Sequence, residues 1–385
     1  MFRFVTAGES HGRGLTAIVE GVPAGLPLDE DYIARDLRRR QGGYGRGGRM
    51  KIEQDWAEIL SGVRHGFTIG SPISLLLWNR DWENWREIMA VSPVESEIEP
   101  VTRLRAGHAD LAGALKYGHQ DVRPVLERAS ARETAARVAV GAIARRLVAE
   151  LGIQIHSHSL AIGGVWSNAK SLDWDRVESS PVRCTDPDAE EGMVKAIDRA
   201  KEAGDSVGGV VQVVATGVPV GLGSHVQWDR RLDGRVAQAV MSVNAVKGVE
   251  IGAGFSLAGM KGSDAHDIIQ YDGETGRWSH QSNRAGGITG GIANGEPLVV
   301  NAVVKPVPTL AKPLPSADLR TGQEVEGHVE RADVCVVPAA GVIAEAMVAV
   351  VLADATLEKF GGDHLAETLR NFQAYLDTIA GRHGH

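Results

Sequence analysis

The apolar residues between positions 140 and 151 recur with the spacing of an α-helix. They stand at positions i, i+3, i+4, i+7, i+8 and i+11, and they are Val140, Ile143, Ala144, Leu147, Val148 and Leu151. This spacing places them on one face of a helix, which predicts that the face packs against a core. Ser130, with Glu133 three residues later, predicts a capping box at the start of the same helix.

The pattern of apolar and polar segments predicts further helices and strands along the chain. Predicted helices cover residues 29–40, with Asp29 as the N-cap, and residues 188–203, 232–243 and 339–360. Predicted strands cover residues 2–6, 15–22, 57–62, 73–78, 153–165, 208–218, 247–255, 298–304 and 334–337. Residues 256–283 carry no clear signal, and the glycine-rich residues 285–295 predict a loop.

The connections between these elements indicate the fold class. Several look too short for the crossovers that parallel strands need, so we predict an α+β layered fold with antiparallel sheets. No linker is long enough to separate independent units, and we expect residues 1–385 to form one domain. We find no apolar run of about 18 residues, which predicts that no segment spans a membrane. The first residues lack a signal-type apolar run.

The composition is that of an ordinary soluble protein with an acidic balance. The 385 residues carry a net charge of −8, and 43% of them are hydrophobic. The two cysteines, Cys184 and Cys335, form no C-x-x-C pair, which predicts a cytoplasmic protein without a disulfide framework or a zinc site. His156 and His158 have metal-binding spacing, but no third ligand stands near them in the sequence, so we assign them a structural role.

An arginine- and glycine-rich stretch between residues 36 and 51 is the strongest chemical signal. Its arginines are Arg38, Arg39, Arg40, Arg46 and Arg49. Guanidinium groups pair well with phosphate and carboxylate, and glycines let the backbone approach a ligand closely. The stretch therefore predicts a loop that binds a polyanionic small molecule, with a solvated basic loop or a nucleic-acid patch as the alternative. Residues 43–48 match the dinucleotide fingerprint, but a helix precedes them and a strand follows, which reverses the Rossmann order.

Further candidate residues stand in loops or at helix ends. His11 and His108 are each next to a glycine and near an arginine, a setting typical of ligand-facing loops. Arg128 and Arg132 flank the predicted helix start, and because helix N-termini attract anions they predict a second phosphate site. Asp333 stands at the rim of a buried segment, close to Arg331 in the sequence, where it is either a positioned base or a member of a buried ion pair.

We assign the other conspicuous side chains to packing. Cys335 stands between valines and is interpreted as an inert buried thiol rather than a nucleophile. Trp78, Trp82 and Trp85 are assigned to packing or to a subunit contact rather than to a substrate.

Seven motifs, taken together and in order, resemble those of the chorismate synthase family. They are GESHG at residues 8–12, GGYGRGGRM at 42–50, GHAD at 107–110, RASARET at 128–134, KGVEIG at 247–252, KPVPT at 305–309 and RAD at 331–333. The resemblance spans nearly the whole chain and implies a β-α-β sandwich with antiparallel sheets around central helices, and a homotetramer. It also implies a reaction in which 5-enolpyruvylshikimate 3-phosphate loses phosphate and a C6 hydrogen to give chorismate. That reaction requires reduced FMN but involves no net redox change.

The resemblance implies roles for individual residues as well. The residues expected to line FMN are Arg128, Ala129, Ser130, Asn244, Ala245, Gly290, Lys305, Pro306, Val307, Pro308, Thr309 and Arg331. The residues expected to meet the substrate phosphate and carboxylates are Arg40, Arg46 and Arg49. The first two are also where the family is expected to meet NADPH, and either NADPH or an external reductase reduces the flavin.

Three side chains are expected to take part in proton transfer. The resemblance implies that His11 protonates the leaving phosphate, that His108 stands near flavin N1, and that Asp333 takes a proton by way of flavin N5. The sequence departs from the family pattern at Ala106, where proline is usual, and at Ala129, where serine is common. Both departures leave the reactive side chains in place, so only the FMN contact at Ala129 is in doubt.

Two other classes of protein are consistent with parts of the sequence. A noncatalytic nucleotide- or RNA-binding protein could use the arginine-rich loop and Lys305, but it predicts a basic balance and aromatic residues among the charges. The chain is acidic, and only Tyr44 stands among the arginines. A metal-dependent hydrolase needs a ligand cluster that the sequence does not offer. We therefore expect no metal ion, no nucleic-acid partner and no membrane partner.

Overall fold

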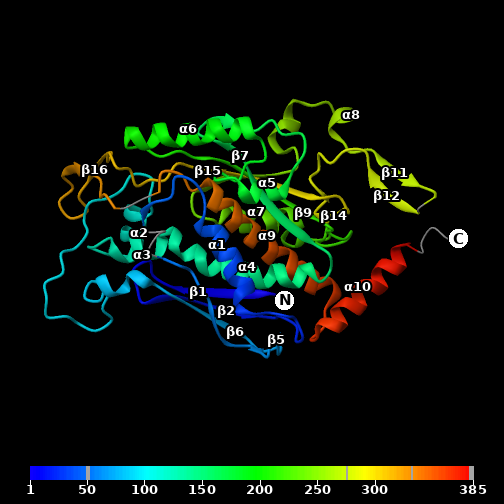
Figure 1. Cartoon of the computed structure of the whole chain (residues 1–385), viewed down its shortest axis with the longest axis horizontal. Coiled ribbons are helices and arrows are strands. Elements are labelled where there is room, and N and C mark those ends of the chain that lie inside the picture. Colours follow the sequence, from blue (N-terminus) through cyan, green and yellow to red (C-terminus); the bar gives the residue numbers. More distant parts are fainter. Residues whose placement is uncertain (49–52, 275, 331–332, 381–385) are drawn as a thin grey trace.

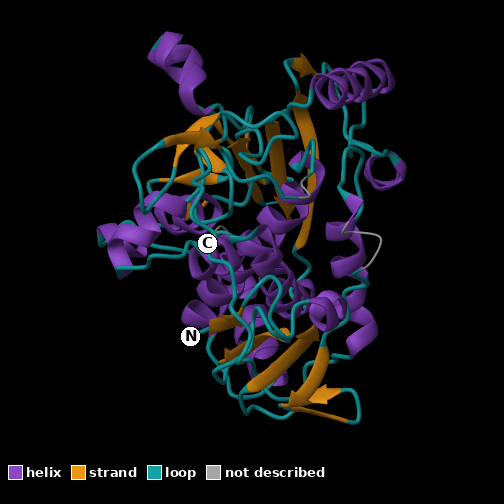
Figure 2. Ribbon diagram, turned by 90° about the vertical axis from the view of Figure 1, so that its left-hand side faces the viewer, coloured by secondary structure: helices purple, strands orange, loops and turns teal. Residues whose placement is uncertain are grey.

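Two antiparallel β-sheets and a layer of helices between them form the framework of the protein (Figure 2). The computed structural model describes residues 1–48, 53–274, 276–330 and 333–380. The first sheet has the order β1–β2–β6–β3, with bounds Arg3–Gly8, Gly14–Glu20, Ile73–Trp78 and Glu58–Ser61. The second has the order β10–β15–β9–β7–β8, with bounds Val246–Ile251, Leu298–Val304, Gly209–Thr216, Gln154–Ile162 and Val165–Trp166. The predicted α+β fold with antiparallel sheets is confirmed.

The first sheet buries every second residue of its central strands. The buried residues of β2 and β6 are Leu15, Ala17, Val19, Ile73, Leu75 and Leu77. The residues between them face away from the core, because successive side chains of a strand point to opposite faces. On that outer face Ile18 lies directly opposite Val5 of β1, and both side chains are exposed. The outer face of the first sheet is therefore partly apolar as well.

Three helices fill the space between the sheets: α1 (Glu30–Gln41), α4 (Thr134–Ala149) and α9 (Val337–Phe360). α4 contacts β2 and β6 of the first sheet, and α9 contacts β7 and β9 of the second. The two helices cross closely because Gly141 of α4 has no side chain where Ala346 of α9 approaches; a Cβ at Gly141 would overlap Ala346. The helices therefore join both sheets into one hydrophobic cluster.

Helix α9 is a long apolar segment, although the sequence analysis expected no apolar run of about 18 residues. By length and composition it could cross a membrane, with a mean hydropathy of 1.9 in its most apolar window, so the prediction that the chain has no such run is wrong. However, 89% of that window is buried inside the protein. α4, α7 and strands of the second sheet pack around the helix, and a helix covered on all sides is apolar on all sides. α9 is a core helix.

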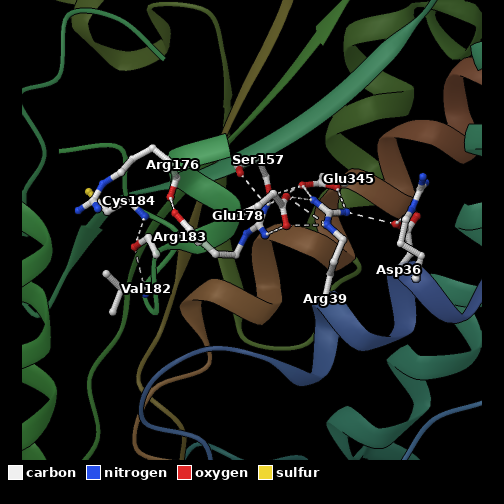
Figure 3. A network of polar contacts seen from close by, with 12 residues as sticks. Asp36, Arg39, Ser157, Arg176, Glu178, Val182, Arg183, Cys184 and Glu345 are labelled. Carbon is white, nitrogen blue, oxygen red and sulfur yellow. Dashed lines mark hydrogen bonds and ion pairs between the residues drawn. The ribbon is translucent and has the colours of Figure 1, made fainter. Parts of the chain in front are cut away.

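A cluster of charged residues surrounds Glu345, a fully buried residue of α9 (Figure 3). Arg39 of α1 donates two hydrogen bonds to its carboxylate, at 2.8 and 2.9 Å. Arg145 of α4 and the hydroxyl of Ser157 in β7 donate further ones, and Arg183 donates another at 3.3 Å. Burial would raise the pKa of Glu345, but the charges of the three arginines lower it below its ordinary range. The carboxylate thus connects α1, α4, α9 and the second sheet.

The remaining elements surround this framework (Figure 1). The helices are α2 (Asp110–Tyr117), α3 (Arg123–Ala129), α5 (Trp174–Ser179), α6 (Pro187–Ala203), α7 (Leu232–Met241), α8 (Gly262–Ala265) and α10 (Leu365–Ala380), with 3-10 turns η2 (Arg80–Asn84), η3 (Ala131–Glu133), η4 (Trp228–Arg230) and η5 (Gly254–Gly259). The hairpins are β4 (Val63–Arg64) with β5 (Phe67–Thr68), β11 (Ile269–Asp272) with β12 (Arg277–His280), β13 (Ile288–Thr289) with β14 (Ile292–Ala293), and β16 (Pro315–Ala317) with β17 (Glu324–Glu326). In Figure 1 the β11–β12 hairpin and α10 project from the body.

The predicted capping box of α4 is wrong. Ser130 does act as a cap, but it accepts the backbone N–H of Arg132 and so begins the 3-10 turn η3, which precedes α4. The carboxylate of Glu133 instead accepts hydrogen bonds from Thr6 of β1 and from Arg137. Glu133 therefore ties the start of α4 to the first sheet, a long-range contact that competes with the local one.

Three segments differ from their predicted local structure. Residues 334–337 do not form a strand, since Cys335 makes only an isolated bridge with Val207 before α9 begins. Residues 256–283 contain the β11–β12 hairpin, and the glycine-rich residues 285–295 contain the β13–β14 hairpin. In the last case Gly290 and Gly291 take positive φ angles of 63° and 88°, which allows a tight turn where only a loop was expected.

Candidate active site

A cavity of about 810 Å³ lies where α1, α3 and the start of α9 meet the loops around them. Its volume is within the range of roughly 300–1,000 Å³ that is common for small-molecule sites. Residues distant in the sequence line it, and those that the sequence predicted are His11, Arg40, Arg46, His108, Ala129, Ser130, Asn244, Ala245, Lys305, Val307, Pro308, Thr309 and Asp333. The structure therefore brings most of the predicted site residues into one cavity.

His11 is held on two sides. Its Nδ1 lies 2.9 Å from a carboxylate oxygen of Glu127, and its backbone N–H donates to the same carboxylate at 2.6 Å. Its ring stacks on Trp85, with centroids 3.9 Å apart and an angle of 26° between the planes. Glu127 is buried, and because a carboxylate beside Nδ1 makes that nitrogen the donor, the contact selects the tautomer and the orientation of the ring.

His108 has a similar carboxylate partner. Its Nδ1 bonds to Asp110, a fully buried residue at the start of α2. Arg105 donates to Asp110 from both its backbone and its side chain, and its Nη2 lies 3.2 Å from Nδ1 of His108. Burial would raise the pKa of Asp110, but hydrogen bonds from His108 and Arg105 lower it. An ionised Asp110 thus fixes the orientation of the imidazole at the cavity wall.

Asp333 bonds to the arginine- and glycine-rich loop. One oxygen accepts the backbone N–H of Gly47 at 2.6 Å, and the other lies 3.2 Å from the guanidinium of Arg46. Arg46 and Asp333 therefore form an ion pair at the cavity, with about one-tenth and one-fifth of their side chains exposed. Arg331, the neighbour that drew attention to Asp333 in the sequence, lies outside the described residues, as does Arg49.

Arg40 lines the cavity but its guanidinium is bound by protein groups. It donates to Thr134 at 3.0 Å, to Asp55 at 3.2 Å and to the carbonyl of Ala131 at 2.9 Å. Burial lowers its pKa to about 10, although Asp55 acts in the opposite direction. Arg40 therefore contributes positive charge at the base of the site and fixes the turn before α4.

The structure does not bring Arg128 and Arg132, the predicted second phosphate site, together in the cavity. Arg128 points away to the first sheet and donates to the carbonyl oxygens of Thr6 and Gly8. Arg132 lies in the cavity wall, but its guanidinium bonds to Asp55 and to Asn79. Both arginines thus stabilise the protein framework around the start of α4.

The residues expected to line FMN fall into two groups. Eight of them line the cavity, and Asn244 donates to the carbonyl of Ala129 at 2.9 Å, which holds two parts of this wall together. Arg128, Pro306 and Gly290 do not line it. Gly290 stands in the β13–β14 turn, and nothing lies within 4 Å of the position where its Cβ would be. Arg331 is outside the described residues.

Several residues of the site were not predicted. Trp85, which the sequence assigned to packing or to a subunit contact, packs on His11 and lines the cavity together with Asp81, Asn84 and Ile88. Glu330 also lines it, and its pKa is lowered to about 2, since His328 and nearby arginines outweigh the effect of burial. None of these residues belongs to a motif, so no local signal identified them.

The described residues include no group of three or more His, Cys, Asp or Glu side chains that could hold a metal ion. His156 and His158 lie against Trp174, with ring centroids 4.7 and 6.1 Å from it, which agrees with a structural role. Both cysteines are buried free thiols. The chemistry available in the cavity is therefore that of imidazoles, carboxylates and guanidinium groups, which suits acid–base catalysis on an anionic molecule.

The sequence and fold are similar to those of known proteins over nearly their whole length. A family model described as Chorismate synthase matches residues 2–357. A chorismate synthase of Moorella thermoacetica is 59% identical over 385 residues, which cover 98% of this chain and 100% of that protein. One of Geobacter sulfurreducens is 55% identical over 390 residues, covering 98% and 99%. A crystal structure of a chorismate synthase has a TM-score of 0.80 and 45% sequence identity, and covers 99% of this chain and 98% of its own.

Proposed function

The chain belongs to the chorismate synthase family, and on that premise we propose that its large cavity binds the substrate beside a reduced FMN. The enzyme is a lyase that eliminates phosphate and a C6 hydrogen from 5-enolpyruvylshikimate 3-phosphate to give chorismate, the last common step of the shikimate pathway. One observation carries the proposal: His11, His108, Arg46 and Asp333 line the same cavity.

We propose that positive charge at the base of the cavity attracts the phosphate and carboxylates of the substrate. Arg46 is the contact residue, since a guanidinium can pair with phosphate through two parallel hydrogen bonds. Arg40 adds positive charge without being the main contact residue, because its guanidinium donates to Thr134, to Asp55 and to the carbonyl of Ala131. Arg49 is proposed to join them.

Proton transfer falls to three side chains in this proposal. As the C–O bond to phosphate breaks, His11 donates a proton to the departing phosphate, and Glu127 holds the imidazole in position beforehand. Asp333 is the final acceptor of the proton that leaves C6. Asp110 orients His108, and we propose that His108 stands near N1 of the bound flavin.

The residues present suit a flavin. The side chains expected around it are small (Ala129, Ala245) or can donate hydrogen bonds (Ser130, Asn244, Lys305), and all five line a cavity of about 810 Å³. Lys305 bonds to the carbonyl of Gly107, so its ammonium group stands beside the His108 loop. We propose that these residues, with Val307, Pro308 and Thr309, hold FMN.

When bound, the reduced flavin would supply electron density to the substrate, and it would be in its reduced state again at the end of the reaction, which has no net redox change. Arg128, Pro306, Gly290 and Arg331 stay predicted FMN residues, and NADPH at Arg40 and Arg46 or an external reductase regenerates reduced FMN.

A flavin assay tests this proposal directly. We expect chorismate and phosphate to form in equal amounts when the purified protein is mixed anaerobically with substrate and chemically reduced FMN. No flavin should be oxidised in proportion to product, because substrate and product have the same oxidation state. Absorbance of chorismate, a phosphate assay and the flavin spectrum measure the three quantities together. Full turnover with oxidised FMN, or one flavin oxidised per chorismate, contradicts the proposal.

We also propose that the enzyme is a homotetramer in which the outer face of the first sheet is covered. Val5, Ile18 and Trp78 lie on that face with 71%, 50% and 44% of their surfaces exposed, and Leu60 on the edge strand β3 is exposed as well. A partly apolar sheet face of this kind is typical of a protein interface.

Replacing Ile18 with glutamate tests this interface. A charge placed among apolar residues of a covered face costs several kcal/mol unless it finds a partner, so the variant is expected to dissociate into smaller species. Analytical ultracentrifugation measures the mass, and Val226→Glu, at an exposed position outside the sheet, is the matched control. A tetramer that persists in Ile18→Glu and a wild-type monomer would each contradict the proposal.

We further propose that residues 1–385 act as one domain in the cytoplasm. One hydrophobic cluster contains residues from Phe2 to Leu365, which supports a single folding unit. Cys184 and Cys335 are free thiols, in keeping with a reducing compartment. The net charge of −8 supports a small-molecule substrate rather than nucleic acid, and the burial of α9 supports a protein without a membrane partner.

A further inference from the structure

We propose that Trp85 is a positioning residue for His11, and that it fixes the plane of the imidazole which donates a proton during the reaction. The inference rests on the proposed function of His11. Its basis is the stacked contact between the two rings, 3.9 Å between centroids at an angle of 26°. Such stacking limits rotation of the imidazole about its Cβ–Cγ bond, a torsion that is otherwise broad.

The second restraint on His11 comes from Glu127. Its carboxylate accepts a hydrogen bond from the backbone N–H of His11 and bonds to Nδ1 of the same residue. The carboxylate fixes one edge of the imidazole, whereas Trp85 fixes its plane. Together they leave one orientation for Nε2, which is the condition for an acid whose proton must meet a leaving group at hydrogen-bond distance.

Trp85 is itself held in place by residues of its own segment and by Arg123 of α3. Its indole N–H donates to Asp81 at 3.2 Å, and its backbone N–H donates to the carbonyl of Trp82 at 2.9 Å. The guanidinium of Arg123 lies 5.1 Å from the centre of its ring. The indole is therefore fixed before a substrate arrives.

Trp85 contributes little to the fold. It follows the 3-10 turn η2 in a segment between β6 and α2, and it is not part of either hydrophobic cluster of the described residues. Ile88, which lines the same cavity, is exposed. Removing the indole should therefore leave the protein folded, so that a kinetic effect can be assigned to the site.

The expected result is a loss of kcat with KM nearly unchanged. Trp85→Ala should lower kcat by about 3- to 10-fold, which corresponds to the strength of one aromatic pair, with KM and the melting temperature near the wild-type values. Trp85→Phe keeps a ring in place and should restore kcat to within about 2-fold. Trp82→Ala is the matched control, because it removes an indole from the same segment without a contact to His11. A larger change in KM than in kcat, or no rescue by phenylalanine, would overturn the proposal.

A double-mutant cycle with His11→Ala separates this inference from the proposed function. If Trp85 acts through His11, Trp85→Ala should have no further effect on kcat once His11 is alanine. Equal losses in both backgrounds would show that Trp85 acts independently of His11, which overturns the inference alone. So would a fully active Trp85→Ala beside an impaired His11→Ala. Normal turnover by His11→Ala would overturn the acid role of His11, and the inference with it.

Discussion

Replacing Glu345 with alanine is expected to lower the free energy of unfolding by about 3–5 kcal/mol, because the change leaves buried arginines without their common counter-ion. Arg39 and Arg183 direct their guanidinium groups at this one carboxylate (Figure 3). Arg145 of α4 donates to it as well. The carboxylate is fully buried in the centre of α9. The loss should therefore far exceed that expected from an exposed ion pair.

Urea unfolding measures this loss, and the same helix offers a control. Glu358 also lies on α9 and pairs with Arg235 at 2.9 Å, but half of its side chain is exposed. Glu358→Ala should cost no more than about 1 kcal/mol, as exposed pairs do. If Glu345→Ala were no more destabilised than this control, the Glu345 cluster would have no net stabilising role.

The pH dependence of the loss follows from the sign of the pKa shift. Because the pKa of Glu345 is lowered in the folded protein, its contribution is fully present above the ordinary pKa of glutamate, about 4.3. The difference between wild type and variant should shrink as the pH falls below that value. Glu178 binds Arg39 and Arg183 in the same cluster and behaves in the same way, since its pKa is lowered to about 2.

Replacing Asp333 with asparagine is expected to lower kcat by about 100-fold or more, while FMN and substrate binding change only a few-fold. Asparagine keeps an oxygen that can accept the backbone N–H of Gly47, as Asp333 does. However, its amide cannot accept a proton from the substrate. Anaerobic single-turnover kinetics measure the chemical step, and flavin fluorescence measures binding.

Asp198→Asn is the matched control for this prediction. Asp198 accepts a hydrogen bond from Tyr44 of the same arginine- and glycine-rich loop at 2.8 Å, but it does not line the cavity. The control should therefore turn over normally. Near-normal kcat in Asp333→Asn would eliminate the base role, and lost FMN binding with a lowered melting temperature would instead identify Asp333 as a structural partner of Arg46.

The sequence predicted those parts of the fold that depend on local patterns. The apolar period after residue 140 identified α4, and Asp29 was correctly chosen as the cap of α1, where it accepts the N–H of Tyr32 at 2.8 Å. The capping box was wrong because Glu133 finds partners on a distant strand. A local rule cannot detect such competition, since the winning contact joins residues far apart in the sequence.

The candidate site was predictable where short motifs carry it. His11, His108 and the arginine- and glycine-rich loop could be recognised by composition, and they meet in one cavity. Their partners could not be recognised, because Glu127 and Trp85 reach His11 only through the fold. Arg46, which the structure places beside Asp333, likewise reaches it only through the fold.

The position of α9 in the chain bears on how the protein is made. Both sheets depend on this helix or on its contact with α4 for their common core, yet its residues are translated only after all the strands. A nascent chain that has not passed residue 360 contains α1 and α4 but lacks the helix that covers β7 and β9 of the second sheet, and such exposed apolar surfaces promote aggregation. Folding of the β-α-β framework is therefore largely post-translational. Messages that end before this helix should yield insoluble chains, and the nascent enzyme is a natural client for chaperones that bind exposed apolar strands.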